Sequence, residues 1–313
     1  MEWSERIGRR IMLRDLHILL AVVQCKSMAR AAEQLAISKP VISKVIANLE
    51  HVLGVRLLER DRHGAEPTSY GAALLRRGIT VFDELRAGVK EIEFLVDPTA
   101  GDVRIGCNPI LATSFLPAVI DRLSRRFPRI VFHVVARQAD TLHRELIDRN
   151  VDFLIARRLG ALTDERLKFD VLFDDKEVVA AGVQNPWVRR RRIELAELMN
   201  EVWVLPPPDN VVGSVVLKAF RARGLDYPRS TVVSDSPHVR MTLLATGRFL
   251  SIFPVSALRF PTKSAEVREL SIDLPRARVP VGIVTLRNRT LGPVARLFIE
   301  QAWEVAMPSA NRT

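Results

Sequence analysis

Cysteines and long apolar runs are scarce in this sequence, and their scarcity excludes several classes of protein. The 313 residues include two cysteines, Cys25 and Cys107, which lie far apart and outside any CxxC motif. A disulfide framework or a structural zinc site is therefore not expected, because both need grouped thiols or histidines. No stretch approaches the ~20 apolar residues of a membrane span, and the first residues lack the apolar core of a secretion signal. We expect a cytoplasmic protein that makes no contact with a membrane.

The motifs of common enzymes are also missing. The sequence contains no GxGxxG, GxxxxGK[ST], HExxH or GxSxG pattern, and its six histidines show no spacing typical of metal ligands. We therefore expect no catalytic residues, no cofactor and no bound metal. A catalytic site assembled from residues distant in the sequence is an alternative that these absences leave open.

Acidic residues are fewer than basic ones, 36 against 47, so the formal net charge is +11. Such a charge favours polyanionic partners such as nucleic acid. Most of the surplus lies in the C-terminal two-thirds, including a run of four arginines at 189–192 that we interpret as a solvated connection. Charge alone therefore supports DNA binding only weakly. The length is sufficient for two or three domains.

Three short amphipathic helices are predicted in the first 54 residues. Apolar residues recur three and four positions apart in a segment around residue 16, in a second after Ser27 and in a third after Ser38. Serine is a favoured N-cap residue, and Pro40 falls in the first turn, where a missing amide donor costs little. Gly54 is typical of a helix end. The Ser-Lys-Pro sequence thus ends one helix and begins the next.

The third predicted helix leaves a narrow polar face uncovered. Its apolar positions are Ile42, Val45, Ile46 and Leu49. Short or cationic side chains occupy the other positions near its start, and these are Ser38, Lys39, Pro40, Ser43 and Lys44. A face of this kind fits a major groove about 12 Å wide, and the amides of a helix N-terminus favour phosphate oxygens. The alternative is an αα-hairpin whose polar faces are merely solvated.

A short basic hairpin is predicted to follow this helix. Residues 55–60 alternate like a strand, residues 62–65 have the composition of a turn, and residues 66–68 close the hairpin. Three helices followed by such a hairpin form a winged helix-turn-helix.

This N-terminal module closely resembles that of the LysR-type transcriptional regulators. The matching positions are Ser27, Ala31, Ala32, Leu35, Ser38, Lys39, Pro40, Val41, Ser43, Leu49, Glu50, Leu53, Gly54, Leu57, Leu58, Glu59, Arg60, Thr68 and Gly71. The resemblance implies a recognition helix that carries Lys39, Pro40, Ser43 and Lys44. It also implies that Arg60 and Arg62 approach the DNA backbone or the minor groove near the wing. Many members have glutamine at the position of Lys39, so the base preference is not implied.

A long helix is predicted from Thr68, a plausible N-cap, to Val96. The stretch lacks proline, and its apolar residues recur at a spacing that suits a partner helix. The predicted dimer seam consists of Leu75, Ile79, Phe82, Leu85, Val89 and Ile92. Packing against the chain's own C-terminal domain is the alternative. A two-fold homodimer predicts an interrupted inverted repeat in double-stranded DNA, and the resemblance implies the same and commonly a homotetramer. Residues 97–101 break the helix and predict a hinge.

Beyond residue 102, predicted strands alternate with predicted helices, the first of which runs over residues 113–127. This alternation indicates an α/β sheet, in which ligands gather beyond the C-terminal ends of the strands. Polar residues expected at those ends form the candidate effector site, and they are Asn108, Thr113, Gln138, Asp209, Asn210 and Ser236. Each of them taken singly is explained as well by an ordinary loop or helix cap.

Residues 101 to about 305 resemble, more loosely, the effector-binding domain of the same family. The matching segments are 103–106, 116–117, 127–128, 150–152, 245–247 and 253–254. The resemblance implies a two-lobed α/β fold similar to periplasmic binding proteins, with a small-molecule effector such as a sugar or an organic acid between the lobes. It places lobe 1 at about 101–175 and 276–307 and lobe 2 at about 176–275.

The predicted chain therefore has an α+β winged helix-turn-helix at 1–70, a linker helix and hinge at 71–100, and an α/β effector domain at 101–313. We expect a ligand-responsive, sequence-specific DNA-binding transcriptional regulator. The alternatives are a ligand-independent DNA-binding protein and an α/β enzyme that carries a DNA-binding module.

Overall fold

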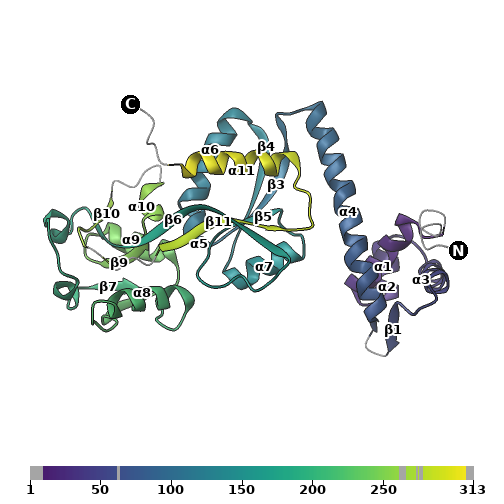
Figure 1. Ribbon diagram of the computed structural model, residues 1–313, viewed down its shortest axis with the longest axis horizontal. Helices are drawn as coiled ribbons and strands as arrows, with labels where there is room; N and C mark the ends of the chain where they lie inside the picture. The colour runs from purple at the N-terminus through teal and green to yellow at the C-terminus, as the bar shows by residue number, and fades with distance from the viewer. Residues whose placement is uncertain (1–9, 62–63, 261–265, 273, 275–277, 308–313) are drawn as a thin grey trace. The chain divides into compact units, whose positions relative to one another are not determined.

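The computed structural model describes residues 10–61, 64–260, 266–272, 274 and 278–307 (Figure 1). The chain divides into two units, Met1–Val89 and Lys90–Thr313. The division falls inside one long helix. Among the residues described, no helix is both long enough and apolar enough to cross a bilayer.

The first unit begins with three helices that share one apolar core. α1 spans Leu13–Cys25, α2 spans Met28–Gln34 and α3 spans Lys39–Leu53. The Ser27 hydroxyl caps α2 by accepting a hydrogen bond from the Arg30 amide, and Gly54 ends α3 with a left-handed φ of 69°. The core side chains that are fully buried include Leu19, Val22, Ala31, Ile42, Ile46 and Leu49. The three predicted helices are confirmed, and so are the cap at Ser27 and the end at Gly54.

The hairpin and the long helix follow in the predicted order. β1 (Leu58–Asp61) pairs antiparallel with β2 (Gly64–Pro67), and α4 runs over Ser69–Val96. The Glu50 carboxylate accepts hydrogen bonds from the amides of Leu57 (2.8 Å) and Leu58 (3.3 Å), so α3 fixes the start of the hairpin. The Thr68 hydroxyl accepts from the Gly71 amide at 3.1 Å, which confirms the predicted cap of α4.

The break after α4 is an ordered turn. The Asp97 carboxylate accepts hydrogen bonds from the Thr99 amide and hydroxyl at 3.1 and 2.7 Å, and it pairs with Arg129 at 2.5 Å. These bonds from Thr99, and then the nearby charge of Arg129, lower the pKa of Asp97. Ala100 and Gly101, predicted as part of the hinge, already belong to the first strand of the second unit.

The second unit is built on a nine-stranded sheet. The strands are β3 (Ala100–Cys107), β4 (Arg129–Ala136), β5 (Phe153–Arg157), β6 (Leu167–Gly182), β7 (Trp203–Leu205), β8 (Ser230–Val233), β9 (Leu250–Pro254), β10 (Val267–Glu269) and β11 (Arg278–Leu286). Their order is β4-β3-β5-β11-β6-β9-β7-β8, and β10 pairs with β6. β3 is parallel to β4 and β5, and β7 is parallel to β8 and β9, whereas β6 and β11 run antiparallel to their neighbours.

One strand joins two lobes. β6 pairs with β11 up to Lys176 and with β9 from Glu177 onward, so it changes partners in the middle of its length. The sequence predicted a strand only for residues 177–183. The first half of β6 was missed because it carries charged residues at consecutive positions, Asp174, Asp175 and Lys176, and so lacks a clear alternation.

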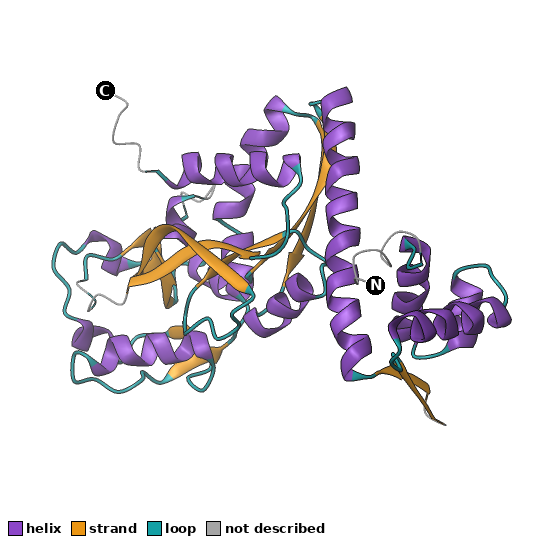
Figure 2. Cartoon of the chain, turned by 45° about the vertical axis from the view of Figure 1, so that its right-hand side comes forward, coloured by secondary structure: helices purple, strands orange, loops and turns teal. Residues whose placement is uncertain are grey.

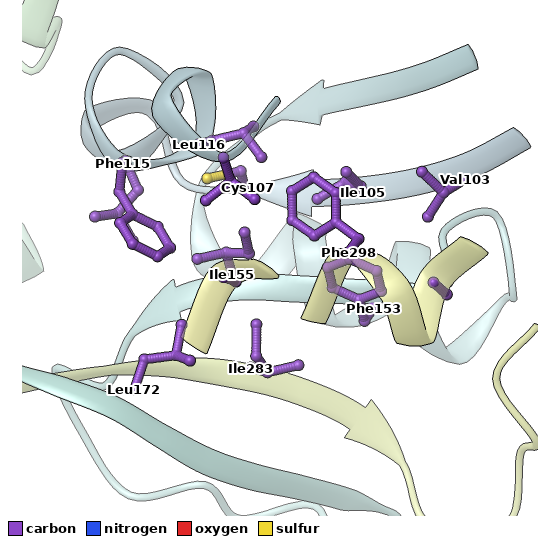
Figure 3. Close-up of a cluster of buried hydrophobic side chains, with 14 of the residues drawn as sticks. Val103, Ile105, Cys107, Phe115, Leu116, Phe153, Ile155, Leu172, Ile283 and Phe298 are labelled. Carbon is purple, nitrogen blue, oxygen red and sulfur yellow. The ribbon is translucent and has the colours of Figure 1, made fainter. Parts of the chain in front are cut away.

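Helices cover both faces of the strands (Figure 2). They are α5 (Pro109–Ala112), α6 (Phe115–Arg126), α7 (Ala139–Ile147), α8 (Val211–Arg221), α9 (Pro237–Ala245), α10 (Ser256–Arg259) and α11 (Pro293–Ala306), with short 3-10 turns at Pro186–Arg189 and Leu195–Leu198. In lobe 1, α6 and α11 pack on one face of the sheet and α7 on the other. Phe115, Phe153 and Phe298 are fully buried in the first of these cores (Figure 3).

The helix predicted over residues 113–127 is wrong at its start. α5 ends at Ala112, Thr113 is its C-cap, and α6 begins at Phe115. The hydroxyls of Thr113 and Ser114 both donate to the Ile110 carbonyl, at 3.0 and 2.8 Å. These local bonds compete with helix continuation and divide the segment.

Candidate functional site

The N-terminal turns of α3 form an exposed polar surface above a buried apolar face. Lys39, Pro40 and Lys44 are exposed and Ser43 is half-buried, whereas Ile42 and Ile46 are inaccessible to solvent. The structure therefore brings the five predicted α3 residues together at one end of the helix. The predicted hydroxyl cap from Ser38 is wrong, since this exposed side chain makes no cap hydrogen bond.

The turn before α3 rests on an unusual backbone conformation. Ala36 has a left-handed φ of 52°, and the Ile37 amide donates to the Ala32 carbonyl at 3.0 Å. This tight turn separates α2 from α3 and directs the start of α3 outward. No residue pattern indicated this turn, because alanine is not typical of the left-handed region.

Val41 adds an apolar side chain to the polar surface of α3, whereas the structure does not describe the side chains of the two predicted wing arginines. Val41, which the sequence reasoning did not select, is 38% exposed beside Lys44 and is a suitable apolar contact for a thymine methyl group. Arg60 lies in β1, but its side chain falls outside what the structure describes, and Arg62 lies outside the described residues.

The predicted dimer seam divides into two parts. Leu75 is buried in the core of the first unit, and Ile79 and Phe82 line a groove with Leu16 and Leu20 of α1. The prediction that Leu75 belongs to the dimer seam is therefore wrong, because its side chain packs in the core of its own winged helix. The apolar residues of α4 that remain exposed are Val81, Leu85, Val89, Ile92, Leu95 and Val96, between 41% and 82%.

The predicted effector residues are mostly helix caps. Asn210 accepts a hydrogen bond from the Gly213 amide at 2.7 Å, and Ser236 accepts one from the Val239 amide at 3.4 Å. Gln138 and Asp209 are exposed next to α7 and α8. The placement of Thr113 at a helix start is wrong, as shown above. These contacts explain each residue locally without any ligand.

Asn108 differs from the others. It precedes α5 at the C-terminal end of β3, and its side chain makes no cap hydrogen bond. Its Oδ1 atom is buried and has no hydrogen-bond partner. A buried acceptor left unpaired is costly, so this atom is a candidate ligand contact.

The sequence reasoning missed a cluster of buried charges where the lobes meet. Arg157, the last residue of β5, pairs with Glu177 of β6 and lies 3.9 Å from the Asp175 carboxylate. Asp175 in turn accepts hydrogen bonds from the Ser256 hydroxyl (2.6 Å) and amide (3.1 Å). Arg240 of α9 is 4% exposed and interacts electrostatically with Glu177 and Arg157. A charged residue that ends an apolar strand, as Arg157 does, was the available signal.

The arginine run at 189–192 and the Cys107 thiol do not indicate a second functional site. Arg191 and Arg192 are exposed and line an open hollow of about 760 Å³, while Arg190 stacks on Trp187 and pairs with Glu197. Burial raises the pKa of the Cys107 thiol, which disfavours the reactive thiolate. Within the described part of the chain, no group of three or more His, Cys, Asp or Glu residues is placed to bind a metal.

Comparison with known families agrees with this architecture. Residues 13–72 match the model of the bacterial regulatory helix-turn-helix protein, lysR family, and residues 97–307 match the LysR substrate binding domain. The chain belongs to the LysR family of transcriptional regulators. It is thus a DNA-binding regulator with an effector-binding domain, and the family consists of regulators rather than enzymes.

Relatives in this family match along nearly the whole chain. GbpR of Azospirillum brasilense is 28% identical over 294 residues, which cover 92% of this chain and 84% of the relative. GltC of Bacillus subtilis is 26% identical, with coverage of 92% and 95%. A full-length OxyR variant from Pseudomonas aeruginosa has a TM-score of 0.63 at 21% identity, covering 96% of this chain and 95% of that one. CbnR in complex with its target DNA has a TM-score of 0.53 at 21% identity, with coverage of 95% and 100%. The structural likenesses confirm the fold.

Proposed function

We propose that this LysR-family regulator reads its operator with the start of α3 and responds to an effector held between the two lobes of its second unit. The exposed, small and cationic end of α3 above a fully buried face carries the first part of the proposal. Ser43 and Lys44 contact base edges or phosphates, and the amides around Ser38 and Lys39 contact a phosphate. Arg60 and Arg62 contact the backbone or minor groove. CbnR, a neighbour in fold, has been crystallised with its target DNA, which supports this arrangement.

The second part of the proposal concerns the effector and the assembly. The effector is a sugar or an organic acid that contacts the ends of β3, β7 and β8, near Asn108, Asp209, Asn210 and Ser236. A homodimer, assembled further into a tetramer, binds an interrupted inverted repeat. The chain catalyses no reaction and acts in the cytoplasm, where the DNA of a bacterium lies.

A test of the DNA contacts uses gel shifts of the full chain with a promoter fragment, its single-base variants and random duplex. Ser43→Ala is expected to change the ranking of the operator variants, because one well-placed base contact discriminates by about 1–3 kcal/mol. Arg62→Ala is the matched control: loss of a phosphate contact weakens binding to all duplexes alike and lowers the salt dependence. An unchanged ranking with Ser43→Ala removes that residue from base recognition, and equal affinity for promoter and random duplex contradicts the proposed function.

The exposed stripe on α4 supports dimer formation, and a double substitution tests it. Leu85→Glu with Val89→Glu places charge on side chains that are 50% and 55% exposed, so the fold of the single chain is expected to persist. Sedimentation should show a shift from dimer or tetramer toward monomer, with weaker operator binding, because two charges would be buried in the seam. Glu91→Gln, an exposed position on another face of the same helix, should leave the assembly unchanged. Wild-type sedimentation of the double variant would show that the seam lies elsewhere.

A further inference from the structure

Arg240 is a buried cation without an anionic partner. Its side chain is 4% exposed, and among the described residues no carboxylate lies within ion-pair distance of it. Its Nη1 donates to the Ile252 carbonyl at 3.2 Å, and its guanidinium lies 4.5 Å from the centre of the Phe253 ring. The Nε atom has no partner. An uncompensated charge in this environment is strongly unfavourable unless an anion arrives from outside.

The groups around Arg240 do not neutralise it. Burial lowers its pKa to about 10, with Glu177, Tyr227 and Asp235 acting against this shift and Arg157 adding to it. The guanidinium is therefore still charged at neutral pH. Glu177 is already bound to Arg157, Asp235 is exposed, and the Tyr227 hydroxyl donates to the Pro206 carbonyl at 2.5 Å. Two carboxylates, Asp175 and Glu177, thus lie within ion-pair distance of Arg157, and neither lies within that distance of Arg240.

One more unpaired polar atom comes from the facing lobe. The Oδ1 of Asn108 is buried without a hydrogen-bond partner among the described residues, whereas the Nε of Arg157 faces the Asp175 carboxylate at 3.9 Å. Asn108 directly follows β3 and Arg157 ends β5, and these two strands are parallel neighbours in which Cys107 pairs with Ile155. Arg240 lies in α9, and its guanidinium contacts Ile252 and Phe253 of β9. Asn108 thus lies at the C-terminal end of a strand in lobe 1 and Arg240 against the C-terminal part of a strand in lobe 2, and ligands bind at such strand ends.

We propose that the effector is a hydroxycarboxylate whose carboxylate pairs with Arg240 and whose hydroxyl donates to the Oδ1 of Asn108. This inference rests on the proposed function, since it assigns a chemical class to the effector of the same site. Guanidinium groups bind carboxylates through two parallel hydrogen bonds, and a neutral sugar offers no such group. An amide oxygen with no donor nearby accepts a hydroxyl proton and rejects an acid that lacks one.

The arrangement also links binding to lobe position. Arg240 belongs to lobe 2, whereas Asn108 belongs to lobe 1, and β6 connects the lobes by continuous backbone. An anion that contacts both sides stabilises the closed arrangement more than an open one. The difference in binding free energy between the closed and open arrangements is what shifts the regulator between its states on DNA.

The experiment measures thermal midpoints of the full-length protein with lactate, malate and gluconate, each at about 10 mM and constant ionic strength. Sorbitol, the polyol without a carboxylate, and hexanoate, the acid without hydroxyls, are the matched probes. At least one hydroxycarboxylate is expected to raise the midpoint, with no shift from sorbitol and a smaller shift from hexanoate. No shift from any hydroxycarboxylate, or an equal shift from sorbitol, overturns the proposal.

Arg240→Met distinguishes a ligand contact from a structural role. The variant removes an uncompensated buried charge while keeping an unbranched side chain, so its midpoint without ligand should not fall below that of the wild type. Its affinity for the active hydroxycarboxylate should fall about tenfold or more, and Arg240→Lys should retain part of the binding. A midpoint lowered in both variants, or an unchanged ligand shift in Arg240→Met, contradicts the assignment. Gel shifts without any ligand test operator binding separately, so failure of the regulator function appears there and not in the thermal shifts.

Discussion

Arg157→Met is expected to lower the free energy of unfolding of the second unit by about 3–5 kcal/mol. Arg157 is 7% exposed and is the cation that pairs with Glu177 and lies beside Asp175. Without it, the buried carboxylates of Asp175 and Glu177 lose the cation with which they form ion pairs. For a domain of this size the thermal midpoint should fall by on the order of 10 °C.

The pH dependence of this loss tests its electrostatic origin. Burial raises the pKa of Asp175, while its hydrogen bonds from Ser256 and the charge of Arg157 lower it. A carboxyl whose folded pKa lies above the unfolded value binds more protons in the folded state, so stability falls as pH rises through the folded pKa. Removal of Arg157 raises that pKa further. The midpoint difference between variant and wild type should therefore be smaller at about pH 5 than at about pH 8.

Arg125→Met is the control for the loss of an arginine ion pair at the surface. Arg125 bonds Asp121 at 3.0 Å, but its side chain is 77% exposed. An exposed pair contributes at most about 1 kcal/mol, so the midpoint should barely change. If Arg157→Met lowered stability no more than Arg125→Met, or by the same amount at both pH values, the buried pair would not be a major source of stability.

Gly71→Ala is expected to destabilise the winged helix severely, by about 3 kcal/mol or more. A Cβ atom at this position would lie 2.0 Å from the Leu57 carbonyl oxygen. That oxygen belongs to the segment leading into β1 and accepts a hydrogen bond from the Thr68 amide at 2.9 Å, so neither backbone is free to withdraw. Chemical unfolding followed by far-UV circular dichroism, together with gel shifts, should show loss of the N-terminal unit and of operator binding.

Gly78→Ala is the matched control on the same helix. Its added Cβ would meet the Leu16 side chain at 3.9 Å, an ordinary contact distance. Alanine also favours the helical state over glycine by roughly 1 kcal/mol, so this variant should be at least as stable as the wild type. Equal behaviour of the two variants would show that the approach of α4 to the Leu57 carbonyl is not close enough to require glycine.

The sequence predicted the helix-turn-helix well because its signals are local. Ser27 and Gly54 act on neighbouring amides and backbone angles, and the spacing of Ile42, Ile46 and Leu49 follows from the helix itself. Such features depend on residues within about one turn of each other. The turn at Ala36 escaped prediction because its conformation is imposed by packing rather than favoured by the residue.

Apolar spacing predicts a buried stripe on α4 but does not name what covers it. Leu75 and Leu85 follow the same repeat, yet Leu75 is buried in the core that α1 shares and Leu85 is half exposed. In the second unit, Thr113 was placed at a helix start because its own hydrogen bond to Ile110 could not be foreseen. The order of the strands and the change of pairing partner along β6 depend on contacts between residues distant in the sequence, so local patterns could not predict them either.

The composition and periodicity of this chain alone determined three short N-terminal helices with an exposed polar face, a long helix and an α/β domain, since burial of apolar surface and helix capping act between near neighbours. Only the tertiary structure placed Arg157 and Arg240, which are 83 positions apart in the sequence, around one glutamate. The pairing of strands distant in the sequence decides whether a charged side chain is solvated, paired with a counter-ion or buried without a partner. The energy of a buried charge therefore depends on tertiary structure rather than on neighbouring residues.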